Sequence, residues 1–203
     1  MIKQQKIVFK LSCKLLENGE MKKFLIFSGV GVFIIILLGG IVMYSIHKTK
    51  SHSPEERINF SQDGLDIAVF YNRPFKRGRE IFGGLVPFGK VWRTGANEAT
   101  TFETNRDLKF ENKTLKAGKY TLWTVPGEET WTVIFNAEVG QWGVNFKGEP
   151  NRDPALDVLS LEVHAVLQDR EFEQFTISFE NMADEAEMVL LWDKTLIAVP
   201  FSY

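Results

Sequence analysis

The pattern of hydrophobic residues changes once along the chain. Residues 24–46 form an apolar run without a single charge, and fifteen of these 23 residues are Leu, Ile, Val or Phe. A helix of this length rises about 35 Å, which is enough to cross a hydrocarbon core of about 30 Å. A buried helix of a soluble core would carry polar residues on at least one face, and this run has no such face. The pattern therefore predicts a transmembrane helix over residues 24–46.

Beyond about residue 64 the hydrophobic period is two, which is typical of β-strands. Pro126 and Gly127 separate the alternating runs 120–125 and 131–135, and this pair favours a type II turn, so we expect a hairpin there. The other alternating runs cover residues 65–71, 159–167, 175–179, 189–192 and 196–201, with a turn expected at Asp193 and Lys194 between the last two.

These runs predict about nine to eleven short strands in about 140 residues, with a turn signal about every 8–12 residues. That spacing is typical of an all-β domain, and we expect an antiparallel β-sandwich of jelly-roll or immunoglobulin-like type, preceded by one transmembrane helix. No run in this part of the sequence has the period of a long amphipathic helix.

Charge is divided as unevenly as hydrophobicity. Residues 1–50 hold eight Lys and two Glu, whereas residues 51–203 hold 16 Lys or Arg and 24 Asp or Glu. Six lysines precede the apolar run and three basic residues closely follow it, so the positive-inside rule places the N-terminus in the cytoplasm. The β-rich part then lies outside, and its acidic balance argues against nucleic acid as a partner.

The predicted organisation has four parts: a cytoplasmic N-terminus (1–23), the helix that contacts the lipid bilayer (24–46), a polar stalk (47–60) and the extracytoplasmic domain (61–203). Because Met21 and two lysines directly precede the apolar run, we hypothesise that residues 1–20 are an upstream extension of the native start. A cleaved signal peptide is the alternative to an anchor. The apolar region of a signal peptide is usually about 7–15 residues long, so we favour the uncleaved anchor.

The chain lacks the common catalytic and metal-binding motifs. Its one cysteine, Cys13, precedes the apolar run, which excludes an intramolecular disulfide and a thiolate site in the β-rich part. No phosphate-binding glycine loop, HExxH motif or Cys/His cluster is present. His164 lies on the polar face of its strand and is expected to be solvent-exposed or locally hydrogen-bonded. We therefore predict no cofactor and no metal.

Residues 71–101 combine arginine, glycine and aromatic side chains unusually densely. The arginine-rich run Arg-Pro-Phe-Lys-Arg-Gly-Arg at 73–79 is expected to be a solvated loop with some affinity for anions. It is followed by Ile-Phe-Gly-Gly-Leu-Val-Pro-Phe-Gly-Lys-Val-Trp-Arg-Thr-Gly-Ala-Asn-Glu-Ala-Thr at 81–100, and by shorter blocks at 116–120, 131–136 and 141–143.

Over about residues 60–201 these blocks closely resemble the bacterial domain-of-unknown-function family numbered 2911. The resemblance implies a secreted or envelope-anchored domain in Gram-negative bacteria, and hence an inner-membrane anchor with a periplasmic domain. It supplies no established activity, so no catalytic residue is carried over. Phe88 stands where tyrosine is expected in that family.

The candidate binding residues are Trp92, Arg93, Asn97 and Glu98. Arg93 offers a planar fork of five donors, Asn97 a donor and an acceptor, and Glu98 an acceptor. With the Trp92 ring beside them, this set suits a polar ligand such as a sugar or a carboxylate. The structural alternative is that Arg93 and Asn97 bond the carbonyls of an irregular loop and that Arg93 pairs with Glu98.

Three functions fit these residues. The first, which we favour, is a non-catalytic binding or scaffold module of the bacterial envelope, whose partner is a glycan, a small polar ligand or an envelope protein. The second is an envelope hydrolase or isomerase that uses Glu98 and Arg93, and a pocket that holds Glu98 near Arg93 or His164 with a raised pKa would favour it. The third is a structural subunit, which would expose an apolar patch.

Overall fold

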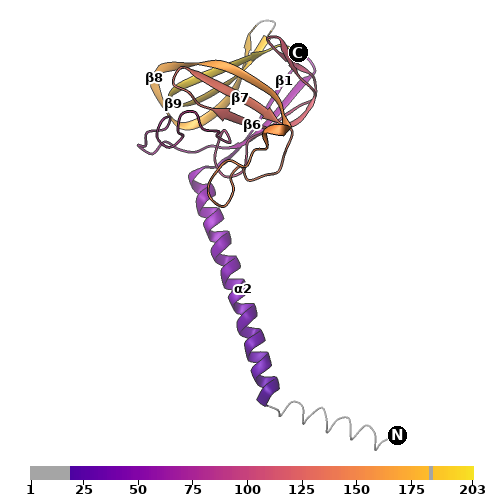
Figure 1. The fold of residues 1–203 in the computed structure, drawn as a ribbon, viewed down its shortest axis with the longest axis vertical. Helices are drawn as coiled ribbons and strands as arrows, with labels where there is room; N and C mark the ends of the chain where they lie inside the picture. The colour runs from indigo at the N-terminus through magenta and orange to yellow at the C-terminus, as the bar shows by residue number, and fades with distance from the viewer. Residues whose placement is uncertain (1–18, 183–184) are drawn as a thin grey trace, which may run out of the picture. The chain divides into compact units, whose positions relative to one another are not determined.

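The computed structural model of the chain describes residues 19–182 and 185–203, and the chain divides into two compact units after Lys48 (Figure 1). The helix α2, Gly19–His52, is long and apolar enough to cross a membrane, and none of its most apolar stretch is buried inside the protein. An N-terminal helix of this kind serves as a membrane anchor or as a signal sequence. Cys13 and residues 1–18 of the hypothetical extension lie outside the described residues.

The second unit, Thr49–Tyr203, is built from antiparallel β-strands, as predicted. Seven strands form one sheet in the order β1-β2-β3-β6-β7-β8-β9, and two form a separate hairpin. The strands of the sheet are β1 (Glu55–Gln62), β2 (Leu65–Asn72), β3 (Thr101–Thr104), β6 (Gly118–Val125), β7 (Thr130–Asn136), β8 (Asp157–Met182) and β9 (Glu185–Phe201). The hairpin consists of β4 (Leu108–Phe110) and β5 (Lys113–Leu115), and one 3₁₀ turn, η1 (Pro154–Leu156), precedes β8.

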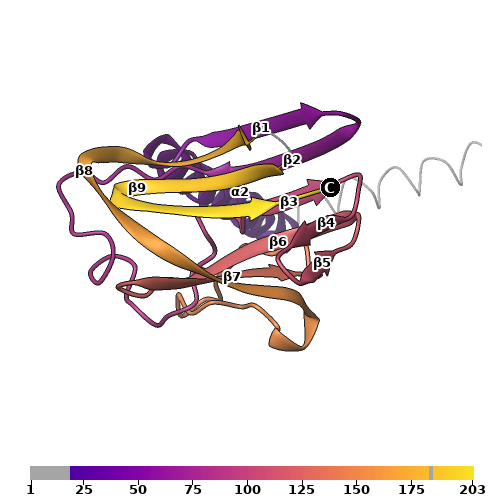
Figure 2. The same cartoon turned by 90° about the horizontal axis from the view of Figure 1, so that it is seen from above.

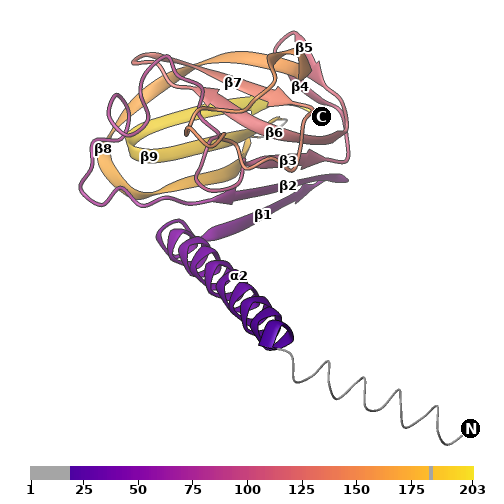
Figure 3. The same ribbon diagram turned by 60° about the horizontal axis from the view of Figure 1, so that its bottom comes forward.

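The sheet curls on itself into a half-barrel (Figures 2 and 3). Strand β8 produces the curl, because its first part pairs with β7 and the rest pairs with β9. Its far part approaches β1, where the rings of Phe60 and Phe179 stack with centroids 5.2 Å apart. The alternating apolar residues of β2, β6, β7 and β9 meet inside the curl as one core. The expected two-sheet sandwich is therefore replaced by a single sheet that encloses the core with one face.

Strands β8 and β9 explain this difference from the sequence prediction. β8 is 26 residues long, and its register against β9 shifts twice near the middle of the strand. The runs 159–167 and 175–179 are thus parts of one bent strand. The turn expected at Asp193 and Lys194 is a kink within β9, where Asp193 has a φ of 54°. The expected polar stalk, residues 47–60, also consists mostly of regular secondary structure, because α2 continues to His52 and β1 begins at Glu55.

Two long loops carry the residues of interest, residues 73–100 between β2 and β3 and residues 137–153 between β7 and η1. Arg73 fastens the start of the first loop to β8, donating through Nε to the Phe175 carbonyl (3.1 Å) and through Nη2 to Thr176 Oγ1 (2.8 Å). Further along, Ile81 and Val86 are buried in the core. The loop is thereby held at several points and does not hang free from the sheet.

Candidate functional site

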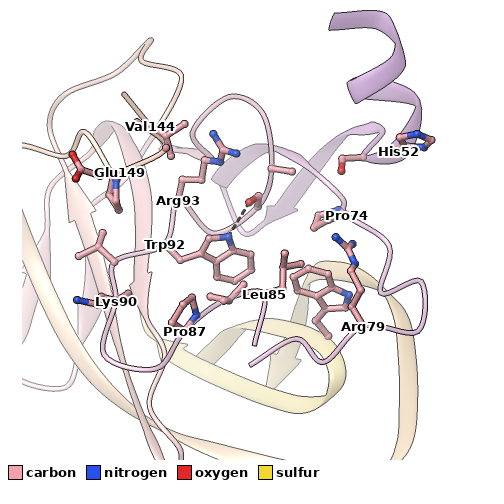
Figure 4. Close-up of a pocket in the computed structure, with 18 of the residues that line it drawn as sticks. His52, Pro74, Arg79, Leu85, Pro87, Lys90, Trp92, Arg93, Val144 and Glu149 are labelled. Atoms are coloured by element: carbon pink, nitrogen blue, oxygen red, sulfur yellow. Dashed lines mark hydrogen bonds between the residues drawn. The ribbon is translucent and has the colours of Figure 1, made fainter. Parts of the chain in front are cut away.

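The two long loops enclose a cavity of about 750 Å³. Residues between 74 and 96 form one part of its wall, residues between 144 and 150 form another, and Trp192 of β9 contributes from the sheet. Figure 4 shows Trp92 and Arg93 between Glu149 on one side and Arg79 on the other. Two of the four predicted binding residues, Trp92 and Arg93, therefore line a cavity.

Trp92 is fixed by its backbone as well as by its ring. Its N–H donates to the Thr124 carbonyl of β6 (2.7 Å), and the Thr124 N–H donates back to the Trp92 carbonyl (2.9 Å). The indole Nε1 donates to the Gly95 carbonyl (2.9 Å). The ring stacks on Trp192 with centroids 5.9 Å apart and meets Phe175 at 5.0 Å. Trp92 thus presents an immobilised aromatic surface to the cavity, with its own polar atom already bonded.

Arg93 is positioned by the second loop. Its Nη1 donates to the Trp142 carbonyl (3.2 Å), and its side chain lies directly against Gly143. A methyl group added at Gly143 would lie 2.6 Å from Arg93 Cδ, so glycine is required there for the approach. Burial lowers the pKa of the Arg93 guanidinium, and the charge of Glu98 offsets only part of that effect. The group nevertheless stays protonated at neutral pH, because an arginine pKa lies far above it.

The other half-buried cations of the second unit have carboxylate partners. Arg152, whose side chain is 11% exposed, pairs with Asp157, and Lys76, at 13%, pairs with Asp193 at 2.6 Å. For Arg93, no carboxylate lies within ion-pair distance among the residues that the structure describes. A partly buried charge without a counterion is unfavourable unless something else supplies the opposite charge.

The backbone beside Arg93 is strained, and several hydrogen bonds hold it in that conformation. Thr94 and Asn97 have φ values of 52° and 56°, a region that a β-branched residue such as threonine rarely adopts. Thr94 is held there by its hydroxyl, 3.1 Å from Thr124 Oγ1, and by its carbonyl, which accepts from Thr100 Oγ1 at 2.7 Å. Such strain persists only where the surroundings enforce it, and it is concentrated at functional sites. The loop that carries Arg93 is therefore pre-organised.

Asn97 and Glu98, the other two predicted residues, do not line the cavity. Asn97 is buried and donates through Nδ2 to Asn72 Oδ1 (3.3 Å) and to the Ser53 carbonyl (3.4 Å). Glu98 accepts from Asn72 Nδ2 (3.0 Å) and pairs with Lys50 Nζ (2.8 Å). Both side chains join the loop to the end of β2 and to the segment before β1. The bond from Asn97 to the Ser53 carbonyl is of the kind set out as the structural alternative, whereas the carboxylate of Glu98 pairs with Lys50 and, among the described residues, not with Arg93.

The ionisation of Glu98 is consistent with this structural position. Burial alone raises the pKa of Glu98, but hydrogen bonds from Lys50, from its own backbone N–H and from Asn72 outweigh it, so the pKa lies below its ordinary 4.5. An acid–base catalyst at neutral pH needs the opposite shift. In the described part of the chain, no ion pair joins Glu98 to Arg93, and the exposed His164 of β8 does not line the cavity.

The cavity has a cationic rim that the sequence indicated only in part. Arg77 and Arg79 come from the arginine-rich run, whose composition was the signal, whereas Lys90 had no distinguishing context. Glu149 supplies the one carboxylate that the described residues place in the lining, and its side chain already accepts from Asn145 Nδ2 at 3.0 Å. The described residues contain no group of three or more His, Cys, Asp or Glu side chains placed to hold a metal.

The sequence of the β-rich part identifies the family of the chain. Residues 53–201 match the family described as "Protein of unknown function (DUF2911)". The chain belongs to the DUF2911 family. This confirms the resemblance seen in the sequence. No curated protein and no solved structure matches the chain.

The cavity connects the DUF2911 resemblance to the structure. Arg93 comes from the 81–100 block, and the residues that brace it, Trp142 and Gly143, come from the separate 141–143 block. The Ala99 N–H also donates to the Gln141 carbonyl (3.3 Å), so the two blocks are joined on both sides of the loop. Two of the blocks that carry the resemblance to DUF2911 thus meet at the Arg93 side chain.

Proposed function

We propose that this DUF2911 protein is a membrane-anchored binding module of the bacterial envelope, and that its cavity binds a small anionic ligand at Arg93. The observation that carries the proposal is the state of Arg93, a partly buried guanidinium that lines a cavity and has no carboxylate partner in the described part of the chain. A bound carboxylate would neutralise the charge of the Arg93 guanidinium and accept two parallel hydrogen bonds from its planar fork.

The rest of the lining supports the same ligand class. Arg77, Arg79 and Lys90 add positive charge to the lining of the cavity, to which Glu149 contributes a carboxylate. Between them lie the Trp92 ring and apolar side chains, which suit the flat, weakly polar face of a sugar or of a similar ring. We propose binding without catalysis, because Glu98, the acid–base candidate, is engaged by Lys50 and Asn72.

The proposed location follows from the sequence and from α2. An uncleaved α2 would anchor the chain in the inner membrane, and the excess of lysines before the apolar run favours a cytoplasmic N-terminus. The β unit and its cavity would then face the periplasm, where envelope glycans and small carboxylates are the available partners.

The ligand class is tested by calorimetric titration of the detergent-solubilised full chain with glucuronate and with glucose, which share a ring but differ in the carboxylate. We expect glucuronate to bind and glucose to bind at least tenfold more weakly. Substitution Arg93→Gln should weaken glucuronate binding about 10- to 100-fold, which corresponds to the loss of a charge-assisted pair of roughly 1.5–3 kcal/mol.

Arg57→Gln is the matched control, because it removes the same charge from an exposed arginine that lies over the Phe70 ring and outside the cavity. It should leave the affinity for glucuronate within about twofold of the unsubstituted chain. Equal binding of glucose and glucuronate, or equal losses in the two variants, would refute an anion site at Arg93.

A further inference from the structure

The indole nitrogen of Trp192 is a buried donor without an acceptor. Trp192 lies on β9, is only 1% exposed, and lines the cavity from the side of the sheet. Within the described residues its Nε1 has no hydrogen-bond partner. By contrast, Nε1 of Trp92 donates to Gly95 and Nε1 of Trp123 donates to Thr121 Oγ1 at 2.9 Å.

A buried donor that is left unpaired is costly, and native proteins keep few of them. Trp131 Nε1 is unpaired as well, but Trp131 does not line the cavity and packs edge-on against Phe82 at 4.7 Å. Among the described residues, only the Trp192 donor therefore combines burial, an unmet hydrogen bond and a place in the wall of the cavity. An acceptor on a ligand would supply the missing partner.

The position of Trp192 relative to Arg93 defines the shape of such a ligand. Trp92 lies between them, since it precedes Arg93 in the chain and stacks on the Trp192 ring with an interplanar angle of 21°. A ligand that reaches both groups must cross the Trp92 surface, where a flat ring gains contact area. Leu85, which also lines the cavity, is 46% exposed and is free to change rotamer around a bound ligand.

We propose that Trp192 Nε1 is the second polar contact of the site, and that the ligand is a carboxylate on an oxygen-containing ring, the chemical class of acidic sugars. The carboxylate binds Arg93, and a neutral acceptor of the ring, such as the ring oxygen, accepts from Trp192. A plain acyl chain or an aromatic hydrocarbon would leave the Trp192 donor unpaired. This inference rests on the proposed function, because it requires an anion at Arg93.

The test compares two carboxylates that differ in one atom, tetrahydropyran-2-carboxylate and cyclohexanecarboxylate, each titrated into the full chain in detergent. The oxygen ring is the less hydrophobic of the two, so burial alone would favour the cyclohexane compound. A hydrogen bond from Trp192 reverses the order, and we expect the oxygen ring to bind about 5- to 100-fold more tightly. Substitution Trp192→Phe should abolish this preference.

A second measurement does not depend on the folding of the Trp192→Phe variant. In ¹⁵N-labelled full chain, tetrahydropyran-2-carboxylate should move the indole N–H resonance of Trp192 downfield, because a hydrogen bond deshields the proton. The resonance of Trp131 is the internal control and should move little. The five indole signals are assigned by single Trp→Phe substitutions at the other four positions, so that Trp192 follows by elimination.

The outcomes separate the two proposals. Equal affinity for both carboxylates, weakened by Arg93→Gln, would leave the anion site standing and overturn the role of Trp192. Failure of both carboxylates to bind, or binding that Arg93→Gln leaves unchanged, would remove the proposed function and this inference together.

Discussion

At the residue scale, the candidate site depends on a position that has no side chain. Gly143 has a φ of 92°, in the left-handed region, and it lies against the aliphatic part of Arg93. These are two separate requirements for glycine, one conformational and one steric. The backbone of the second loop can therefore brace the guanidinium from the Trp142 carbonyl only while residue 143 stays small.

Substitution Gly143→Ala should reduce both stability and ligand affinity. The left-handed conformation costs alanine about 1–2 kcal/mol, and the new methyl group pushes Arg93 out of position. We expect glucuronate to bind at least about fivefold more weakly in calorimetry, alongside a lower midpoint of thermal unfolding.

Gly140→Ala is the control, since Gly140 has a φ of 90° and nothing lies within 4 Å of an added methyl group. It should lower stability by a similar amount and leave glucuronate affinity unchanged. If both variants weakened binding equally, backbone strain alone would explain the effect and the contact with Arg93 would not matter.

The four predicted site residues show how much of the site could be predicted from the sequence. The sequence placed Trp92 and Arg93 together, a tryptophan ring beside a guanidinium in a glycine-rich segment, and both side chains line the cavity. The same reasoning selected Asn97 and Glu98, but the positive φ values at Thr94 and Asn97 turn the chain so that these two side chains meet Asn72. Local turns of that kind are not encoded in residue type alone.

At the scale of elements, β2 and β8 are not neighbours in the sheet, yet a single side chain joins them. The Tyr71 hydroxyl of β2 accepts from the backbone N–H of Ile177 in β8 at 3.0 Å, and the tyrosine is 1% exposed. Burial raises the pKa of that hydroxyl, so it remains protonated at any physiological pH. The contact holds the curled sheet together across its interior.

Substitution Tyr71→Phe should cost about 1–3 kcal/mol of unfolding free energy in urea denaturation, because the Ile177 N–H loses its acceptor in a dry core. Tyr120→Phe is the comparison. The Tyr120 hydroxyl donates to the carbonyl of the exposed Lys116 (2.9 Å), which water can satisfy afterwards, so we expect less than about 1 kcal/mol. A larger loss for Tyr120→Phe would contradict the proposed closure through Tyr71.

Individual strands were predictable, whereas their assembly was not. Alternation in residues 65–71 gives β2 nearly to the residue, because buried and exposed side chains alternate over most of that strand. The apolar run 131–135 gives β7 as closely, although the later residues of β7 are buried on both faces. In β8 the alternation extends to Leu167, which is 78% exposed, since the strand has left the core by then. Register shifts within β8 decide between a sandwich and a curled sheet, and a hydrophobic period of two is the same in both.

At the scale of the whole molecule, the net charge beyond residue 50 and the charge around the cavity have opposite signs. The segment beyond residue 50 is acidic overall, yet the cavity rim is basic. The acidic surface favours solubility, and the local cations attract an anion only at short range, within a Debye length of about 8 Å at physiological salt.

The proposed topology gives a direct prediction for cells. Protease added to spheroplasts that express the full chain should degrade the β unit, because the proposed topology places that unit outside the inner membrane. A cytoplasmic protein in the same cells serves as the control and should stay intact. Protection of the β unit in spheroplasts, together with its degradation after lysis, would reverse the orientation inferred from the lysines.

The contribution of β9 to the cavity also bears on how the protein is made. Trp92 and Arg93 leave the ribosome about 100 residues ahead of Trp192, an interval of about 5–20 s at ordinary elongation rates. During that interval the Trp92 ring lacks the Trp192 ring on which it stacks, and apolar side chains that later lie against β9 are open to misassociation. The cavity is therefore complete only after β9 has been synthesised, and we expect chaperones that bind exposed apolar segments to associate with the incomplete chain.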